Sequence, residues 1–187
     1  MGGSHGGHKH KKEYNISDIH IPENGNFNEN ISEPELSDDE VTMLREMWTI
    51  VNKHVAKVGT VLFVDLFETH PEVEDVFMSF RNNSSSEQEY QHIIRAHALR
   101  VMGTVDKCIY RLNNRDKLRE LMFGLGKRHK NYNMKTDQIE LMGPQFITSI
   151  KPHLENMWTK EHEHAWENLF LLMCYHMKKG MRSISYE

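Results

Sequence analysis

The stretch around which this sequence is organised reads EQEYQHIIRAHALRVMGTVDKC and spans residues 87–108. Its apolar side chains recur at intervals of three or four residues, which predicts a helix with one apolar face. His97 falls on that face, in a stripe that consists of Ile94, Val101, Val105 and Cys108. A neutral imidazole in an apolar setting still needs a partner for its ring nitrogens, either a metal or a buried polar group.

A second stretch, LRELMFGLGKRH over residues 118–129, repeats the pattern. His129 continues an apolar stripe one turn beyond its last member, the stripe being Leu118, Leu121, Met122 and Leu125. One histidine on an apolar face is more often a satisfied core residue than a metal ligand. Two such histidines on two expected helices leave both interpretations open.

The rest of the chain predicts further helices and no strand, because no segment shows sustained alternation of apolar and polar residues. Capping boxes are expected at Ser37–Glu40, Thr69–Glu72 and Ser86–Glu89. Helices are expected from residue 37, over 55–68 and 71–76, from 136 or 137 to about 154, and over 160–181. Pro144 and Pro152 lie inside the fourth of these, so we expect it to kink or to end early.

Length and composition favour one domain of ordinary size with an N-terminal tail. The 187 residues are 38% apolar and carry a net charge of −4, which does not favour a nucleic-acid partner. We expect a disordered extension over residues 1–36, a helical domain over 37–182 and a short tail over 183–187. Cys108 and Cys174 lie in apolar stripes, which favours buried free thiols in a reducing compartment. A disulfide between them is the alternative, and it requires the two helices to meet there.

The N-terminal extension is rich in glycine and histidine at its start and polar beyond it. It cannot bury enough apolar surface to offset the entropy of ordering. No signal peptide is expected, so we place the chain in the cytoplasm. Gly2 is a candidate for acylation after removal of Met1, although Gly6 stands where the strict motif has Ser or Thr. Acylation would attach the chain peripherally to the inner face of the plasma membrane.

Taken in order, these features resemble a globin over about residues 36–182, most like the neuroglobin and globin X group. The matching positions are Trp48, Pro71, Phe77, Phe80, His97, Val101, Leu125 and His129. The resemblance implies the all-α globin fold, with seven to eight helices around one haem b, an iron protoporphyrin IX.

The resemblance also implies a role for each matching residue. His129 is expected to be the proximal iron ligand, and His97 the distal one, which in this group commonly binds the iron itself when no gas is present. Arg100 is expected to reach a haem propionate. The remaining expected contacts are Phe77, Phe80 and Leu125 on the haem, and Phe63 and Val101 in the distal ligand pocket.

The function that follows is reversible binding of oxygen or another diatomic gas by a six-coordinate globin. A role in oxygen binding, redox sensing or electron transfer is expected, with an unidentified reductase as partner and a monomeric chain. One alternative is a haem oxidoreductase, either a nitrite reductase or a nitric oxide dioxygenase. For the dioxygenase, Phe63 stands where such globins favour Tyr. The other alternative is a helical interaction module that binds no haem.

Overall fold

The computed structural model describes residues 32–183, apart from the side chain of residue 79. Contacts divide the chain into two units, Met1–Ser32 and Glu33–Glu187, and the helices of the described residues belong to the second. Residues 1–31 of the expected disordered extension, the acylation at Gly2 and the last four residues of the expected C-terminal tail lie outside the described residues, whereas residues 32–36 of the extension are described. None of the helices in the described part is both long enough and apolar enough to cross a membrane.

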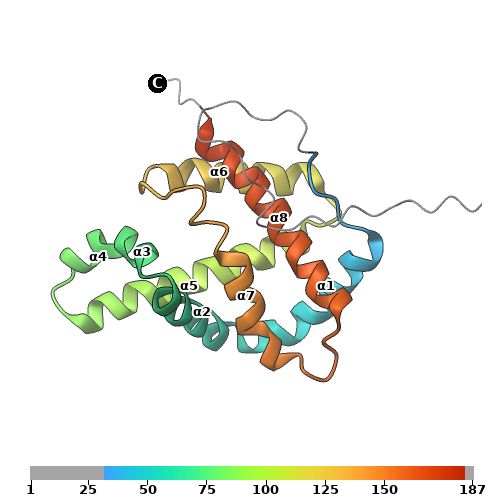
Figure 1. The fold of residues 1–187 in the computed structure, drawn as a ribbon, viewed down its shortest axis with the longest axis horizontal. Coiled ribbons are helices and arrows are strands. Elements are labelled where there is room, and N and C mark those ends of the chain that lie inside the picture. Colours follow the sequence, from blue (N-terminus) through green and yellow to red (C-terminus); the bar gives the residue numbers. More distant parts are fainter. Residues whose placement is uncertain (1–31, 184–187) are drawn as a thin grey trace, which may run out of the picture. The chain divides into compact units, whose positions relative to one another are not determined.

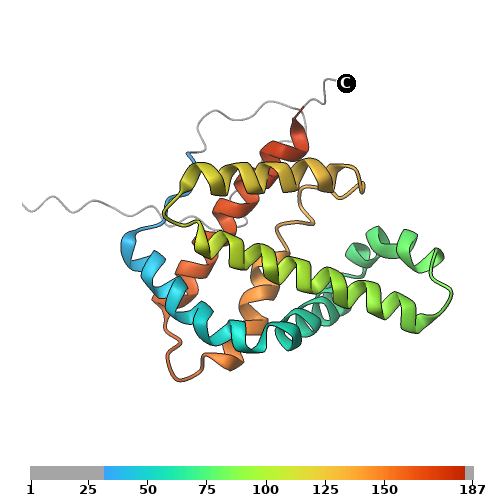
Figure 2. The same cartoon turned by 180° about the vertical axis from the view of Figure 1, so that it is seen from behind.

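Residues 32–183 form helices and no strand, which confirms the predicted all-α class (Figures 1 and 2). The α-helices are α1 (Asp38–Val51), α2 (Val55–Thr69), α3 (Pro71–Glu74), α4 (Met78–Asn82), α5 (Glu87–Tyr110), α6 (Arg115–Lys130), α7 (Met142–Ile150) and α8 (Lys160–Arg182). Three 3-10 segments, η2 (Asn52–His54), η3 (Asp75–Phe77) and η4 (Lys151–His153), adjoin them.

The first helix begins as predicted, at a complete capping box. The amide of Glu40 donates to Ser37 Oγ at 3.3 Å, and the Ser37 amide donates to the Glu40 carboxylate at 2.7 Å. At α5 only half of the expected box forms. Ser86 Oγ accepts the amide of Glu89 at 3.2 Å, but the Glu89 carboxylate accepts from the backbone and hydroxyl of Ser85 instead.

The predicted cap at Thr69 is wrong, because this residue still belongs to α2. Its hydroxyl donates back to the carbonyl of Asp65, one turn earlier, at 2.7 Å. The next helix begins at Pro71 after His70, with no side-chain cap. Proline suits this place because a first-turn amide has no partner within the helix.

The predicted start of the next long helix, at residue 136 or 137, is also wrong, since α7 begins only at Met142. Pro144 explains the late start: it has no amide hydrogen to donate within a helix, and it is tolerated in the first turn. The expected early end is confirmed, because α7 stops at Ile150 and the short η4, with Pro152 in its first turn, follows.

Glycines allow two helix pairs to cross closely. A Cβ on Gly126 of α6 would overlap the carbonyl oxygen of Met177 on α8, and would lie 2.8 Å from its carbonyl carbon. Gly180 of α8 stands equally close to the carbonyl of Phe123. A Cβ on Gly59 of α2 would lie 3.4 Å from the carbonyl of Ala98 on α5. The α6–α8 crossing at Gly126 lies three residues before His129, and the α2–α5 crossing at Ala98 lies next to His97.

Both cysteines are buried as free thiols, as predicted: Cys108 in α5 and Cys174 in α8. Burial raises the pKa of each thiol to about 12, because the interior disfavours the charged thiolate. A thiol with so high a pKa is a poor nucleophile.

Candidate functional site

His129 projects from the last turn of α6, with one ring nitrogen tied to its own helix. Its Nδ1 lies 3.0 Å from the carbonyl oxygen of Leu125, one turn earlier. A carbonyl only accepts, so Nδ1 carries the hydrogen and Nε2 keeps a free lone pair. Burial lowers the pKa of His129, an effect that the hydrogen bond to Leu125 opposes and the charge of Arg128 reinforces. The imidazole is therefore neutral at pH 7, in the tautomer that ligates a metal through Nε2.

His97 projects from the middle of α5 and is also neutral. Its pKa is lowered to about 4, chiefly by burial, and the charges of Arg100 and of a protonated His129 contribute in the same direction. Within residues 32–183 no hydrogen bond is found for either of its ring nitrogens. An imidazole without such a partner leaves a nitrogen lone pair available to a ligand.

The two imidazoles come from different helices and lie near enough to interact. A charge on His129 disfavours protonation of His97. Figures 1 and 2 show α6 and the long α5 one above the other in both views. The pair therefore offers two neutral nitrogen donors, one from each helix, which suits a metal that brings its other ligands with it.

Aromatic rings enclose the His97 side of the site. The rings of Phe63 and Phe77 stand nearly perpendicular to the imidazole, at centroid distances of 5.2 and 5.1 Å. Phe80 extends this wall at 6.1 Å from Phe77, and Tyr132 follows at 6.4 Å from Phe80. The sequence reasoning missed Tyr132, which follows α6 in a turn. The feature of the sequence that could have identified Tyr132 is its position, three residues and so about one helical turn after His129.

The other predicted residues lie at the margin of the same region. Val101 and Leu125 are half-buried and pack against the core, so part of each side chain remains uncovered. Arg100 is exposed, and its charge still acts on His97. Two free imidazole nitrogens, an apolar lining and a cation at the rim match a flat apolar ligand with anionic groups at its edge. These residues therefore fit a haem.

One part of the predicted apolar stripe of α5 is placed differently. Ile94 and Val101 are only half-buried, whereas Ala98 and Met102 are fully buried. The close crossing at Gly59 explains this, because α2 packs directly on Ala98 and Met102. His97 consequently lies beside the buried face, where a ligand can reach it.

Comparisons with known proteins agree with this geometry. The family model described as Globin matches residues 60–177. A cytoglobin-1 of Oryzias latipes is 26% identical over 146 residues, covering 76% of this chain and 82% of its own. A neuroglobin of Tetraodon nigroviridis is 24% identical over 147 residues, covering 78% and 92%. The crystal structure of a hexacoordinated heme protein from an anhydrobiotic tardigrade superposes with a TM-score of 0.70 at 18% identity, covering 79% of this chain and 96% of the other.

Proposed function

The chain belongs to the globin family, most like the neuroglobin group, and from that premise we propose that it binds haem b and, reversibly, oxygen or another diatomic gas. We propose further that His97 and His129 both bind the iron when no gas is present. The observation that carries the proposal is the pair of neutral, neighbouring imidazoles with free ring nitrogens. The tardigrade protein of similar fold, described as hexacoordinated, supports it.

When bound, haem would supply an iron that imidazole nitrogens or a diatomic gas can ligate. The hydrogen bond from His129 Nδ1 to Leu125 holds the ring in one orientation and makes Nε2 a better donor. Phe63 and Phe77 limit the access of water to the His97 side, because their rings stand edge-on against that imidazole. Arg100 at the rim is the residue that we assign to a propionate.

His97 would compete with a gas for the iron, so bulk oxygen transport would be a poor assignment. Redox sensing or electron transfer suits such a site better, with a reductase as partner. The proposal includes a monomeric, cytoplasmic chain, attached to the inner face of the plasma membrane if Gly2 is acylated.

The test is the anaerobic visible spectrum of the haem-reconstituted, dithionite-reduced protein, with and without carbon monoxide. Sharp, resolved bands are expected before carbon monoxide is added, because His97 and His129 would both hold the iron. His97→Leu should merge them into one broad band and speed carbon monoxide binding, and His129→Leu should lose stable haem binding. His92→Leu is the matched control, since His92 is an exposed histidine of the same helix.

Three results contradict the proposal. A broad band from the unmodified protein would refute ligation by His97 at rest. So would an unchanged spectrum in His97→Leu. Folded protein that stays colourless after haem supplementation would favour the interaction module.

A further inference from the structure

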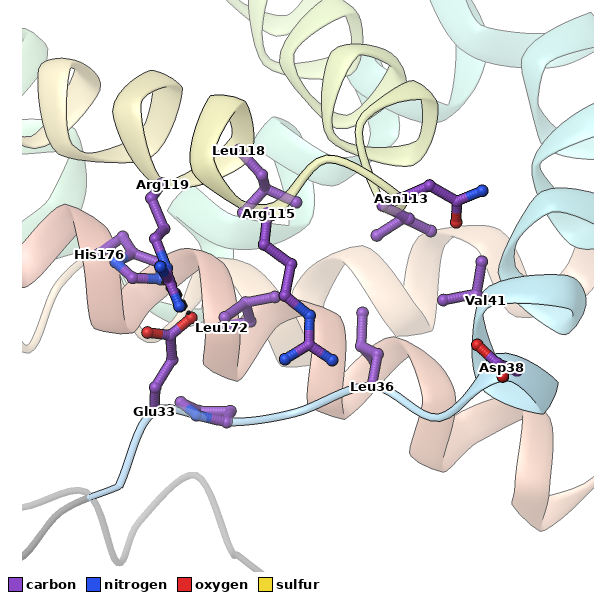
Figure 3. Close-up of a pocket in the computed structure, with 12 residues that line it drawn as sticks. Glu33, Leu36, Asp38, Val41, Asn113, Arg115, Leu118, Arg119, Leu172 and His176 are labelled. Atoms are coloured by element: carbon purple, nitrogen blue, oxygen red, sulfur yellow. Dashed lines mark hydrogen bonds and ion pairs between the residues drawn. The ribbon is translucent and has the colours of Figure 1, made fainter.

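A cavity of about 470 Å³ lies between the segment that precedes α1 and helices α6 and α8 (Figure 3). We call this segment, residues 33–37, the N-terminal strap. None of the residues assigned to haem lines the cavity. Its volume lies in the range of small-molecule sites. Its apolar lining consists of Pro34, Leu36, Val41, Leu112, Leu118 and Leu172.

One end of the cavity already holds a carboxylate. Glu33 of the strap accepts from Arg119 Nε at 3.0 Å, and the same oxygen lies 3.2 Å from Nε2 of His176. His176 belongs to α8, and its side chain is only 6% exposed. Although Glu33 is close, His176 Nε2 forms no well-aligned hydrogen bond within the described part of the chain. The protein's own side chain thus shows that a carboxylate fits here, and it leaves one buried nitrogen incompletely satisfied.

The guanidinium of Arg115 lines the cavity together with that of Arg119. Figure 3 shows Arg115 extending from α6 between Glu33 and Leu36. Its ion pair is with Glu35, at 3.1 Å, and the Glu35 side chain is 76% exposed. A surface pair of this kind contributes about 1 kcal/mol or less, so Arg115 can exchange its partner at little cost.

Charged and apolar side chains follow one another along the cavity. Figure 3 shows Arg119 and His176 at the Glu33 end, Leu118 and Leu172 next to them, then Arg115 and Leu36, and Asp38 at the other end, beside Val41. Asp116 also pairs with Arg119, through Nη1 at 3.2 Å, but it is almost fully exposed and leaves Nε to Glu33. An anionic group therefore belongs at the Glu33 end and an apolar body further along.

We propose that this cavity binds a molecule with a carboxylate head and an aliphatic body, of the class of medium-chain carboxylic acids. The head replaces Glu33 on Arg119 and His176 and adds Arg115, giving charge-assisted hydrogen bonds from two guanidinium groups. The body packs against Leu118 and Leu172, under the strap. The strap and the ligand compete for the same cations, and this competition makes the proposal testable without reference to haem.

The experiment titrates the full-length protein with decanoate, by calorimetry and by amide chemical shifts. Decanoate should bind at least tenfold more tightly than decanol, which lacks the charge, and than acetate, which lacks the body. The shifts should appear in residues 33–37 and around Leu118 and Leu172, and not around His97. Shifts centred on His97, or equal binding of decanol, would overturn the proposal.

Variants test the competition itself. Glu33→Gln should bind decanoate about fivefold more tightly, because a neutral amide holds Arg119 less strongly than a carboxylate does. The double variant Arg115→Gln, Arg119→Gln should bind at least tenfold more weakly. Arg45→Gln, at an exposed position of α1, is the matched control and should not change affinity. Circular dichroism shows whether the double variant folds. If it does not, Glu33→Gln still tests the proposal, because an affinity of Glu33→Gln for decanoate that is unchanged or lower would overturn it.

Discussion

Gly126→Ala is the substitution that most directly tests how α6 is placed. The added Cβ would overlap the carbonyl oxygen of Met177, and its distance to the carbonyl carbon would be 2.8 Å. Ordinary contact begins at 3.4 Å, so α6 and α8 must separate by at least ~0.6 Å at this point, and by more to clear the oxygen. The obstacle is backbone and not a flexible side chain, so it cannot turn away. His129 lies three residues further along and would move with α6.

Two effects of opposite sign set the change in the free energy of unfolding that Gly126→Ala causes. Overpacking a tight contact costs about 1–3 kcal/mol, while alanine is about 1 kcal/mol better than glycine inside a helix. Gly124→Ala separates them, because a Cβ there would meet only the end of the Arg128 side chain, at 3.9 Å. The two variants should therefore differ by about 2 kcal/mol, which corresponds to roughly 4–8 °C in Tm for a chain of this size.

The assay is thermal unfolding of both variants, followed by circular dichroism. The rate at which haem passes to an excess acceptor protein is measured alongside. Gly126→Ala should unfold at the lower temperature and lose haem faster than Gly124→Ala. A Gly126→Ala protein as stable as Gly124→Ala, with the same rate of haem loss, would refute the idea that this crossing positions His129.

Two further predictions concern polar contacts elsewhere. Lys178→Met should destabilise the fold by about 3 kcal/mol in urea unfolding, because Lys178, with a side chain 3% exposed, pairs with Glu140, 22% exposed, and the carboxylate would lose its partner. Adding Glu140→Leu should restore at least half of the loss, and a neutral single variant would contradict this account. At Glu40, burial raises the pKa, but hydrogen bonds from Ser37 and Asn168 outweigh it and leave the pKa below 4.5. A lowered native pKa stabilises the fold above the unfolded pKa, and this contribution is lost as pH falls through the native pKa. The stability advantage over Glu40→Gln at pH 7 should therefore vanish in acid, and a difference that is constant from pH 7 to about pH 3 would be inconsistent with it.

Features that depend on neighbours along the chain were predictable. The helical spacing of apolar residues indicated both long helices and put His97 and His129 on or beside apolar faces. The box at Ser37 and Glu40 formed as predicted, because its partners are three residues apart. The predicted cap at Thr69 failed where two local options compete. Its hydroxyl can cap the next helix or bond back to the previous turn, and the structure takes the second.

Features that depend on which helices meet were not predictable. The sequence by itself determined that the chain is helical, where most helices begin and end, and that two helices each carry a histidine in line with an apolar stripe. Only the tertiary structure decided that Gly126 meets Met177, that Tyr132 joins the aromatic wall, and that Glu33 lies between Arg119 and His176. The physical reason is the separation along the chain over which each kind of interaction acts. Helix periodicity and capping arise from contacts within about four residues, whereas a small residue permits a close crossing without specifying its partner, which long-range packing selects.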